Sequence, residues 1–233
     1  MNKIDTAMIL AAGFGSRLKP LTDNLPKSLV EFKGKPMIEN VIGKLEIAGI
    51  RNFVINTHHH YEKMIKYFDM RLPTSNIRLI YEKEILGTGG AIKNAEKYLR
   101  GSNDFLVYNT DVDCAIDLNE FEEYHLGRKS VATLAVQNRK TSRYLLTDKD
   151  GLLVGRKENG NNVYYRKIID NNIENKAFCG IHILNKSIFD YLEPKVIIDI
   201  IPVYISMLKQ DLAINTFDIT GTQWKDLGIP ENL

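Results

Sequence analysis

Short apolar runs alternate with helix-like segments over the first 111 residues, and this alternation limits the possible folds more than any other feature. Strands are predicted at residues 7–12, 52–56, 77–81 and 105–108, where apolar runs end in glycine or polar residues. Helices are predicted between them at 36–48, 61–70 and 89–99, where apolar residues recur at helical spacing. This order predicts a mostly parallel sheet covered by helices on both faces.

The pattern changes near residue 130, where turn signals separate short strands. Strands are predicted at 131–136, 144–147, 164–169 and 178–184, with turns at Asp150-Gly151 and Asn159-Gly160 and a helix at 196–208. This half predicts hairpins that add to a mixed sheet. Because no repeat or Pro/Ser-rich linker separates the halves, we expect a single α/β domain over 1–233, made of parts 1–130 and 131–233.

The chain has 233 residues, with 31 Lys and Arg against 29 Asp and Glu, a net charge of +2. A nearly neutral chain gives no reason to expect a nucleic-acid polymer as a partner. The apolar run at 7–12 is shorter than a signal-peptide core or a membrane span, so we expect a cytoplasmic protein without a membrane partner. In that compartment Cys114 and Cys179 are expected to be buried, reduced thiols. The sequence does not indicate an oligomeric state.

The loop after the first predicted strand combines two glycines with two cations. Gly13 and Gly15 let the backbone approach an anion closely, so their N–H groups can surround a phosphate. Arg17 adds a planar fork for phosphate oxygens, and Lys27 adds a compact positive charge. Such a loop suits a triphosphate.

Other interpretations of this loop compete with nucleotide binding. A flexible loop with surface cations would need no ligand. A dinucleotide-binding GxGxxG turn would need glycine where Leu18 stands, and an acidic residue where Asn56 and Thr57 end the second strand. A P-loop would need Gly-Lys followed by Ser or Thr, which this loop lacks. The residues therefore favour nucleotide binding of another type.

Asp111 follows the apolar strand at 105–108. Open α/β sheets bind ligands at the carboxyl ends of their strands, and a carboxylate there suits Mg²⁺. Asp111-Val112-Asp113 is also a DxD sequence, which holds the metal in many nucleotide-sugar glycosyltransferases. The structural alternative for Asp111 is a helix cap or a turn residue, and the same alternative holds for Asp226, which lies in a polar turn. Asp113 is expected to be a spare acid that does not bind the metal.

The stretch from Leu10 to Lys27 resembles the signature of the sugar-1-phosphate nucleotidylyltransferases, LAxGxGxRLxPLTxxxPK, at every fixed position. Residues 86–91 resemble the family's LGTxGA loop, and 109–111 resemble the strand end that carries a metal-binding aspartate. Residues 224–231 resemble the terminal WxDxGTPE segment, whose aspartate is the second metal ligand. The resemblance implies a Rossmann-like three-layer nucleotidyltransferase fold, with a mostly parallel mixed sheet, a nucleotide-binding half at 1–130 and a smaller, hairpin-rich sugar-binding part at 131–233.

The resemblance also implies site residues. Arg17 and Lys27 are expected to be catalytic, and Asp111 and Asp226 to hold Mg²⁺. The expected nucleotide-binding residues are Leu10, Ala11, Ala12, Gly13, Phe14, Gly15, Ser16, Gly87, Thr88, Gly89 and Asn109. The family's Glu-Lys-Pro segment, whose lysine meets the sugar phosphate, is missing. Lys157 and Gly180 are the candidates at that end, and Arg166 and Lys167 compete with Lys157.

Two further features have a structural and a functional interpretation. The triplet His58-His59-His60 cannot direct all three rings at one ion from a regular element, so a solvated strand end is expected before a metal site or a pocket wall. The only tryptophan, Trp224, is expected to pack in the core.

The resemblance implies Mg²⁺-dependent transfer of a nucleotidyl group from an NTP to a sugar 1-phosphate, with release of pyrophosphate. The segments 56–59 and 178–182 look most like the N-acetylmuramate-1-phosphate uridylyltransferases, so UTP with that or a related sugar phosphate is the first expectation. A GTP-dependent mannose- or heptose-1-phosphate guanylyltransferase is the alternative. A DxD glycosyltransferase and a non-catalytic regulatory module of the same fold are alternatives from other classes.

Overall fold

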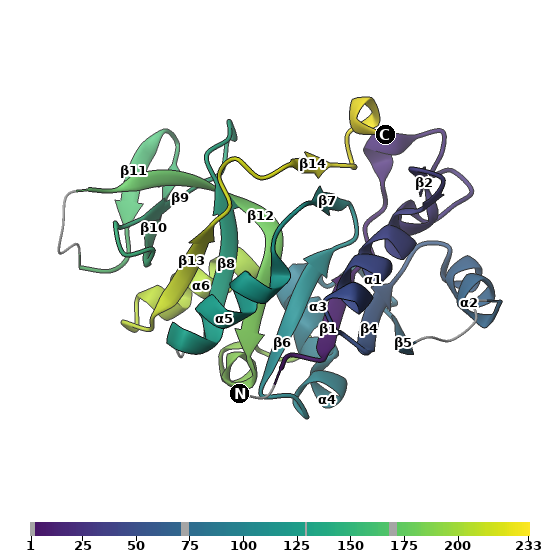
Figure 1. Cartoon of the computed structure of the whole chain (residues 1–233), viewed down its shortest axis with the longest axis horizontal. Coiled ribbons are helices and arrows are strands. Elements are labelled where there is room, and N and C mark those ends of the chain that lie inside the picture. The colour runs from purple at the N-terminus through teal and green to yellow at the C-terminus, as the bar shows by residue number, and fades with distance from the viewer. Residues whose placement is uncertain (1–2, 71–74, 129, 168–171) are drawn as a thin grey trace.

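The computed structural model describes residues 3–70, 75–128, 130–167 and 172–233, and Figure 1 shows two halves joined through one curved sheet. The strands are β1 (Thr6–Leu10), β2 (Glu31–Phe32), β3 (Lys35–Pro36), β4 (Asn52–Thr57), β5 (Asn76–Tyr81), β6 (Asp104–Asn109), β7 (Val112–Cys114), β8 (Ala132–Gln137), β9 (Tyr144–Thr147), β10 (Leu153–Glu158), β11 (Asn161–Tyr164), β12 (Glu174–Asn185), β13 (Ile214–Asp218) and β14 (Trp224–Asp226). The helices are α1 (Met37–Ile47), α2 (Tyr61–Asp69), α3 (Gly87–Asn94), α4 (Glu96–Leu99), α5 (Leu118–Arg128) and α6 (Ile200–Leu208).

The large sheet runs β11-β10-β9-β12-β6-β1-β4-β5, and β8 pairs with both β12 and β13. Strands β6, β1, β4 and β5 are parallel to one another, whereas β12 is antiparallel to β6. This confirms a mixed sheet with a parallel nucleus in the first half and hairpins in the second.

Helices cover both faces of the sheet. Alternate residues of a strand face opposite sides, and here the residues on both sides are apolar and buried. On β1, Ala7 and Ile9 pack in a core with Val41 and Leu45 of α1. Met8, between them, packs in a second core with residues of α3 and α6. The arrangement is the three-layer fold that the sequence predicts.

Two of the predicted helices have other bounds in the structure. The helix expected at 196–208 begins only at Ile200, since Pro202 lacks an N–H and is tolerated only in a first turn. The helix expected at 89–99 begins at Gly87 and is divided into α3 and α4 at Ala95.

The strand expected at 164–169 lies at Asn161–Tyr164 instead, because Asn159 and Gly160 both have positive φ and form a tight turn directly before it. Residues 168 and 169 lie outside the described residues. Strand β13 was not predicted from the sequence.

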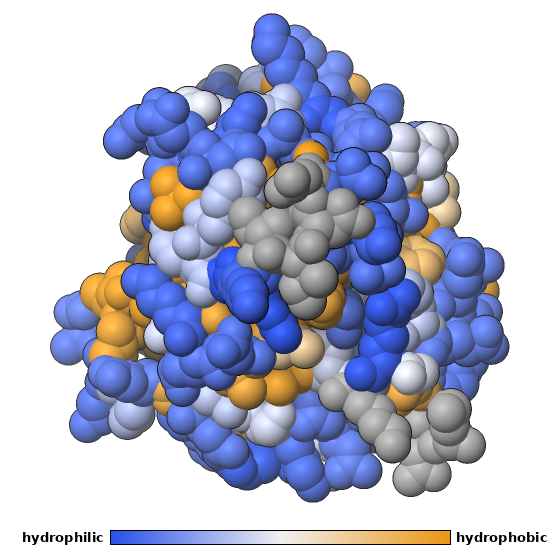
Figure 2. Space-filling model, turned by 90° about the vertical axis from the view of Figure 1, so that its left-hand side faces the viewer, coloured by the Kyte–Doolittle hydropathy of each residue, from blue (hydrophilic) through white to orange (hydrophobic). Residues whose placement is uncertain are grey.

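Figure 2 looks onto the end of the molecule that lies on the left in Figure 1, where hydrophilic residues cover most of the visible face and hydrophobic groups are smaller and scattered. Within the described part of the chain, no helix is long and apolar enough to cross a bilayer. Cys114 and Cys179 are free, buried thiols, as expected, and burial raises the pKa of Cys179 to about 12.

Candidate active site

Two ion pairs lie where the loop after β1 meets the carboxyl end of β6. Lys27, which is only 9% exposed, donates a hydrogen bond from Nζ to Asp111 Oδ2. Arg17 Nη2 lies 3.4 Å from Asp226 Oδ2. The four residues predicted to be catalytic or metal-binding therefore meet in one place, although they come from three distant segments of the chain.

A short antiparallel ladder between β7 and β14 brings the two aspartates together. Asp226 pairs with Val112, the residue after Asp111, and the Leu227 N–H donates to the Asp111 carbonyl at 2.7 Å. Figure 1 shows β14 crossing over β7 from the hairpin half toward the half that holds β2. This crossing segment carries Asp226 to the loop after β1 that contains Arg17.

Gly228 leaves the space in which these charges converge. A Cβ atom at Gly228 would lie 2.6 Å from Lys27 Nζ, 2.7 Å from Arg17 Nη2 and 2.8 Å from Asp226 Oδ1. The Gly228 N–H also donates to Asp226 Oδ1 at 2.8 Å. A glycine here lets both cations and one carboxylate occupy the same small region.

Two cavities meet at this charged centre. The larger has a volume of about 1190 Å³ and reaches the hairpin strands, and the smaller has about 240 Å³ and lies beside β1 and β4. Both are lined by Leu10, Thr88, Asn109, Asp111 and Asp199. Two compartments that share a charged boundary suit a reaction between two bound substrates.

The smaller cavity contains most of the predicted nucleotide contacts. Those that line it are Leu10, Ala11, Ala12, Gly13, Gly87, Thr88 and Asn109. Gly15 has a different role, because its φ is +66° and a Cβ there would lie 2.9 Å from Lys27 Cβ. The Gly89 N–H already donates to the Ile198 carbonyl at 2.9 Å, so this amide is occupied within the chain. Phe14 and Ser16 are exposed residues of the same loop.

A buried carboxylate that was not predicted lines the smaller cavity. Glu82 is 2% exposed and accepts a hydrogen bond from Asn56 Nδ2 at 2.9 Å, while Asn56 Oδ1 accepts the Ala11 N–H at 2.9 Å. Burial raises the pKa of Glu82, although the bonds from Asn56 and the Leu86 N–H offset part of the rise. A carboxylate has about four acceptor positions, so Glu82 can still accept from a ligand.

The histidine triplet braces two loops. His58 Nδ1 hydrogen-bonds the Glu82 carbonyl at 2.8 Å, and His60 Nε2 hydrogen-bonds the Asp23 carbonyl at 3.1 Å. Phe14 packs edge-on against His58, with ring centroids 5.3 Å apart. These rings therefore support the loop after β1 from the side of β4.

Asp113 is held in ion pairs away from this centre. Its carboxylate lies 2.8 Å from Lys33 Nζ and 3.5 Å from Lys44 Nζ. Burial opposes its ionisation, but the two lysines outweigh burial and lower the pKa of Asp113. Asp113 is therefore not placed to bind the metal. Its ion pairs link β7 to α1 and to the turn between β2 and β3.

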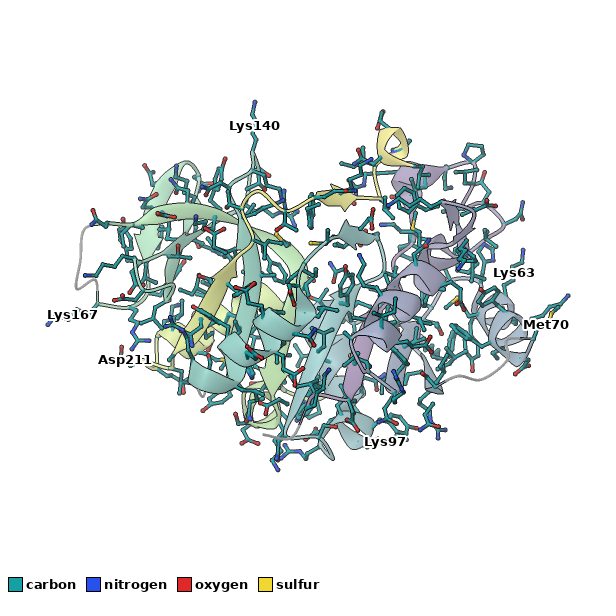
Figure 3. All side chains as sticks on the ribbon, in the orientation of Figure 1. Lys63, Met70, Lys97, Lys140, Lys167 and Asp211 are labelled. Carbon is teal, nitrogen blue, oxygen red and sulfur yellow. The ribbon has the colours of Figure 1, made fainter. Side chains whose placement is uncertain are left out.

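The larger cavity contains the predicted acceptor-side residues. Gly180 lines it with a φ of +74°, and a Cβ there would lie 2.7 Å from Asn109 Nδ2. Lys157 lines it from β10. Arg166 instead donates to the Leu212 carbonyl at 3.3 Å, and Lys167 points outward from the left-hand edge in Figure 3.

Arg139, which was not predicted, also lines the larger cavity and lies against Trp224, two residues before Asp226. Its guanidinium stacks on Trp224 at 3.9 Å and donates to the Phe178 carbonyl at 2.7 Å. Trp224 is part-buried against the core, as expected, and it also lines the larger cavity two residues before Asp226. Arg139 is therefore well placed to meet an anion beside that carboxylate.

A neutral histidine forms part of the larger cavity. Burial lowers the pKa of His182 to about 3, and its Nδ1 hydrogen-bonds the Tyr204 hydroxyl. His182 can therefore offer a hydrogen bond to a bound molecule without adding charge.

Asp111 and Asp226 form a donor set that suits a hard divalent cation. Asp226 lies on β14 and Asp111 directly precedes β7, the strand with which β14 pairs, and both carboxylates line the larger cavity. Mg²⁺ is commonly held by one or two carboxylates together with substrate phosphates and water. Among the described residues, no group of three or more His, Cys, Asp or Glu side chains is arranged to hold a metal. The pair would therefore need the substrate to complete the site.

Comparison with known proteins agrees with this geometry. The family model described as Nucleotidyl transferase matches residues 6–233. The chain belongs to the nucleotidyl transferase family. It is 33% identical to a mannose-1-phosphate guanyltransferase of Yarrowia lipolytica over 238 residues, which cover 97% of this chain and 61% of that protein. The chain thus spans about three-fifths of the length of this curated relative.

The comparison with solved structures covers nearly the full length of both chains. HddC from Yersinia pseudotuberculosis is 29% identical, with a TM-score of 0.75, and the match covers 98% of this chain and 96% of that one. HddC has also been solved in complex with GMP-PN, and that structure matches with a TM-score of 0.75 at 28% identity.

Sequence reasoning missed Glu82, Arg139 and Gly228. Glu82 is the first acid of a Glu-Lys-Glu run that looks solvent-exposed, and nothing local distinguishes Arg139 from the cations around it. Gly228 did carry a signal, since it is the glycine of the WxDxGTPE-like segment.

Proposed function

We propose that this protein transfers a guanylyl group from GTP to a sugar 1-phosphate, releasing pyrophosphate and forming a GDP-sugar. The observation that carries the choice of base is Glu82, a buried carboxylate in the wall of the smaller cavity. An ionised carboxylate only accepts hydrogen bonds. Guanine offers it two adjacent donors, N1–H and the N2 amino group, on one edge of the base.

The other bases match Glu82 less well. Uracil presents one N–H between two carbonyl oxygens, so a carboxylate facing it would meet one donor and two acceptors. Adenine and cytosine each present an amino group next to an acceptor nitrogen. Base edges are read by such hydrogen-bond patterns. Glu82 therefore favours guanine.

The comparisons support the same choice. The Yarrowia relative is named a mannose-1-phosphate guanyltransferase, and HddC was solved with GMP-PN. These relatives support the GTP alternative better than the first expectation of UTP with N-acetylmuramate 1-phosphate. Mannose 1-phosphate is accordingly the first acceptor to test.

The reaction needs no protein nucleophile. An oxygen of the sugar phosphate attacks the α-phosphorus of GTP, the bond from that phosphorus to the bridging oxygen breaks, and pyrophosphate leaves. The protein has to align two polyanions and neutralise their charge. Arg17 and Lys27 supply that charge at the boundary of the two cavities. Mg²⁺ held by Asp111 and Asp226 would polarise the α-phosphoryl group.

Pyrophosphate release tests the proposal. The four NTPs are each combined with Mg²⁺ and the 1-phosphates of mannose, heptose, N-acetylglucosamine and N-acetylmuramate. We expect release that requires GTP together with a sugar 1-phosphate. We also expect Glu82→Gln to lower kcat/KM for GTP by about tenfold to hundredfold, the value of a charge-assisted hydrogen bond.

Other outcomes identify the alternatives. Release only with UTP and N-acetylmuramate 1-phosphate would restore the first expectation. A folded protein that binds GTP but releases no pyrophosphate with any acceptor would instead be a regulatory module.

A further inference from the structure

The larger cavity extends well beyond the catalytic charges. Strand β10 lies three places from β6 in the order β10-β9-β12-β6, which is roughly 14 Å at about 4.8 Å between neighbouring strands. The cavity nevertheless reaches Lys157 on β10, and its 1190 Å³ exceeds the roughly 300–1,000 Å³ of pockets that hold drug-sized ligands. A sugar phosphate at the catalytic end therefore leaves this distant wall free for a substituent.

The described Asp and Glu side chains pair with only some of the cations that line the cavity. Five cationic side chains line the cavity: Arg17, Arg139, Arg143, Arg156 and Lys157. Arg17 pairs with Asp226, and Arg156 Nη2 pairs with Glu158 at 2.5 Å. In the part of the chain that the structure describes, the other three form no ion pair with an Asp or Glu side chain.

These three cations divide between the two ends of the cavity. Arg139 stacks on Trp224 beside the catalytic centre, where it can meet the 1-phosphate. Arg143 directly precedes β9, and Lys157 Nζ lies 5.5 Å from the Tyr144 ring centroid. Arg156 pairs with Leu145 across β9 and β10, so Arg143 and Lys157 lie at the same end of this hairpin.

We propose that the acceptor is a sugar 1-phosphate with a second anionic group, a carboxylate or a phosphate, which Arg143 and Lys157 bind at the distant wall. This inference rests on the proposed nucleotidyl transfer. The guanidinium of Arg143 offers a planar fork and Lys157 a compact charge, and both suit an anionic oxygen cluster. A neutral sugar would leave both cations to water.

Competing acceptors test the proposal in the presence of GTP. Mannose 1-phosphate is compared with mannuronate 1-phosphate and mannose 1,6-bisphosphate. We expect at least one acidic acceptor to exceed mannose 1-phosphate by about tenfold to hundredfold in kcat/KM, because its second anion gains charge-assisted hydrogen bonds. The better of the two identifies the group as carboxylate or phosphate.

Variants locate the preference at the distant wall. Arg143→Gln and Lys157→Gln should each reduce the ratio of kcat/KM between the acidic acceptor and mannose 1-phosphate. Lys140→Gln is the matched control, since Lys140 belongs to the same connection between β8 and β9 but points away from the molecule in Figure 3. It should leave the ratio unchanged.

Calorimetric titration of each acceptor without GTP separates this proposal from nucleotidyl transfer. Tighter binding of an acidic acceptor that is lost in Arg143→Gln, with no pyrophosphate release from any pair, would reject the transfer and keep the second-anion site. Efficient transfer to mannose 1-phosphate with no preference for either acidic acceptor would reject the second-anion site and keep the transfer.

Discussion

Lys27 donates a hydrogen bond to Asp111, so a cation suited to the reacting phosphates forms an ion pair with a carboxylate suited to Mg²⁺. Arg17 and Asp226 form a second such pair. Each pair holds its cation at the boundary of the two cavities. Both cations and both carboxylates are thereby held where the proposed reaction would need them.

Removing either cation should slow the reaction while the protein still folds. We expect Lys27→Ala or Arg17→Ala to lower kcat by roughly 10²–10³, as for other groups that stabilise developing charge. Steady-state pyrophosphate release measures the loss, and the melting temperature checks the fold. Lys33→Ala is the control, because Lys33 pairs with Asp113 outside the site. Near-normal turnover in Lys27→Ala would remove Lys27 from the reaction.

Asp111→Asn should raise the Mg²⁺ concentration needed for half-maximal rate sharply, since a neutral amide binds a hard cation more weakly than a carboxylate does. A Mg²⁺ titration of the rate measures this. Asp113→Asn provides a comparison two residues away, because Lys33 and Lys44 hold the Asp113 carboxylate. Identical titrations for wild type and Asp111→Asn would contradict the assignment.

The fold was predictable where a local pattern and burial coincide. Residues 7–12 read as a strand because β1 is buried along its length, and Pro36 marked the start of α1. The predicted helix at 196–208 begins too early because residues 196–198 are apolar for a reason other than helix formation. Val196 and Ile198 pack against the glycines at the start of α3, where the Ile198 carbonyl accepts the N–H groups of Gly89 and Gly90.

The site residues likewise divide into those that a local sequence pattern predicts and those that depend on tertiary contacts. Arg17, Lys27, Asp111 and Asp226 lie in recognisable segments, so their roles could be predicted before their proximity was known. Glu82 could not be predicted, because its role depends on its burial and on its hydrogen bond with Asn56, which lies 26 residues earlier on β4. Tertiary contacts of this kind leave no periodic trace in the sequence.

Gly228→Ala should lower activity without unfolding the protein. The added Cβ would lie within 2.8 Å of three charged atoms, so Lys27, Arg17 or Asp226 would have to move. A displacement of about 1 Å at reacting groups can cost roughly 10²-fold in rate. Gly127→Ala in α5 is the control, since a Cβ there meets nothing within 4 Å. Equal kcat/KM for Gly228→Ala and wild type would show that the charges do not need this space.

Guanine binding should weaken in acid as Glu82 takes up a proton. Burial raises the pKa of Glu82 above its ordinary value of 4.5, and the two guanine N–H groups bind the ionised form. The bound complex therefore has a lower Glu82 pKa than the free protein, and GMP affinity should fall as pH drops through the pKa of the free protein.

The raised pKa of Glu82 affects folding stability in the opposite direction: it favours the folded state at low pH, whereas GMP affinity is favoured at high pH. The folded state holds the proton more tightly than the unfolded chain, so the Glu82 contribution is present below pH 4.5 and is lost as pH rises through the raised pKa. Calorimetric titration with GMP and denaturant unfolding, each repeated over this pH range, measure the two effects. Glu82→Gln should remove the Glu82 component from both profiles, while the titration of the GMP phosphate itself remains. If the difference in GMP affinity between wild type and Glu82→Gln does not vary with pH, the Glu82 carboxylate does not bind the base.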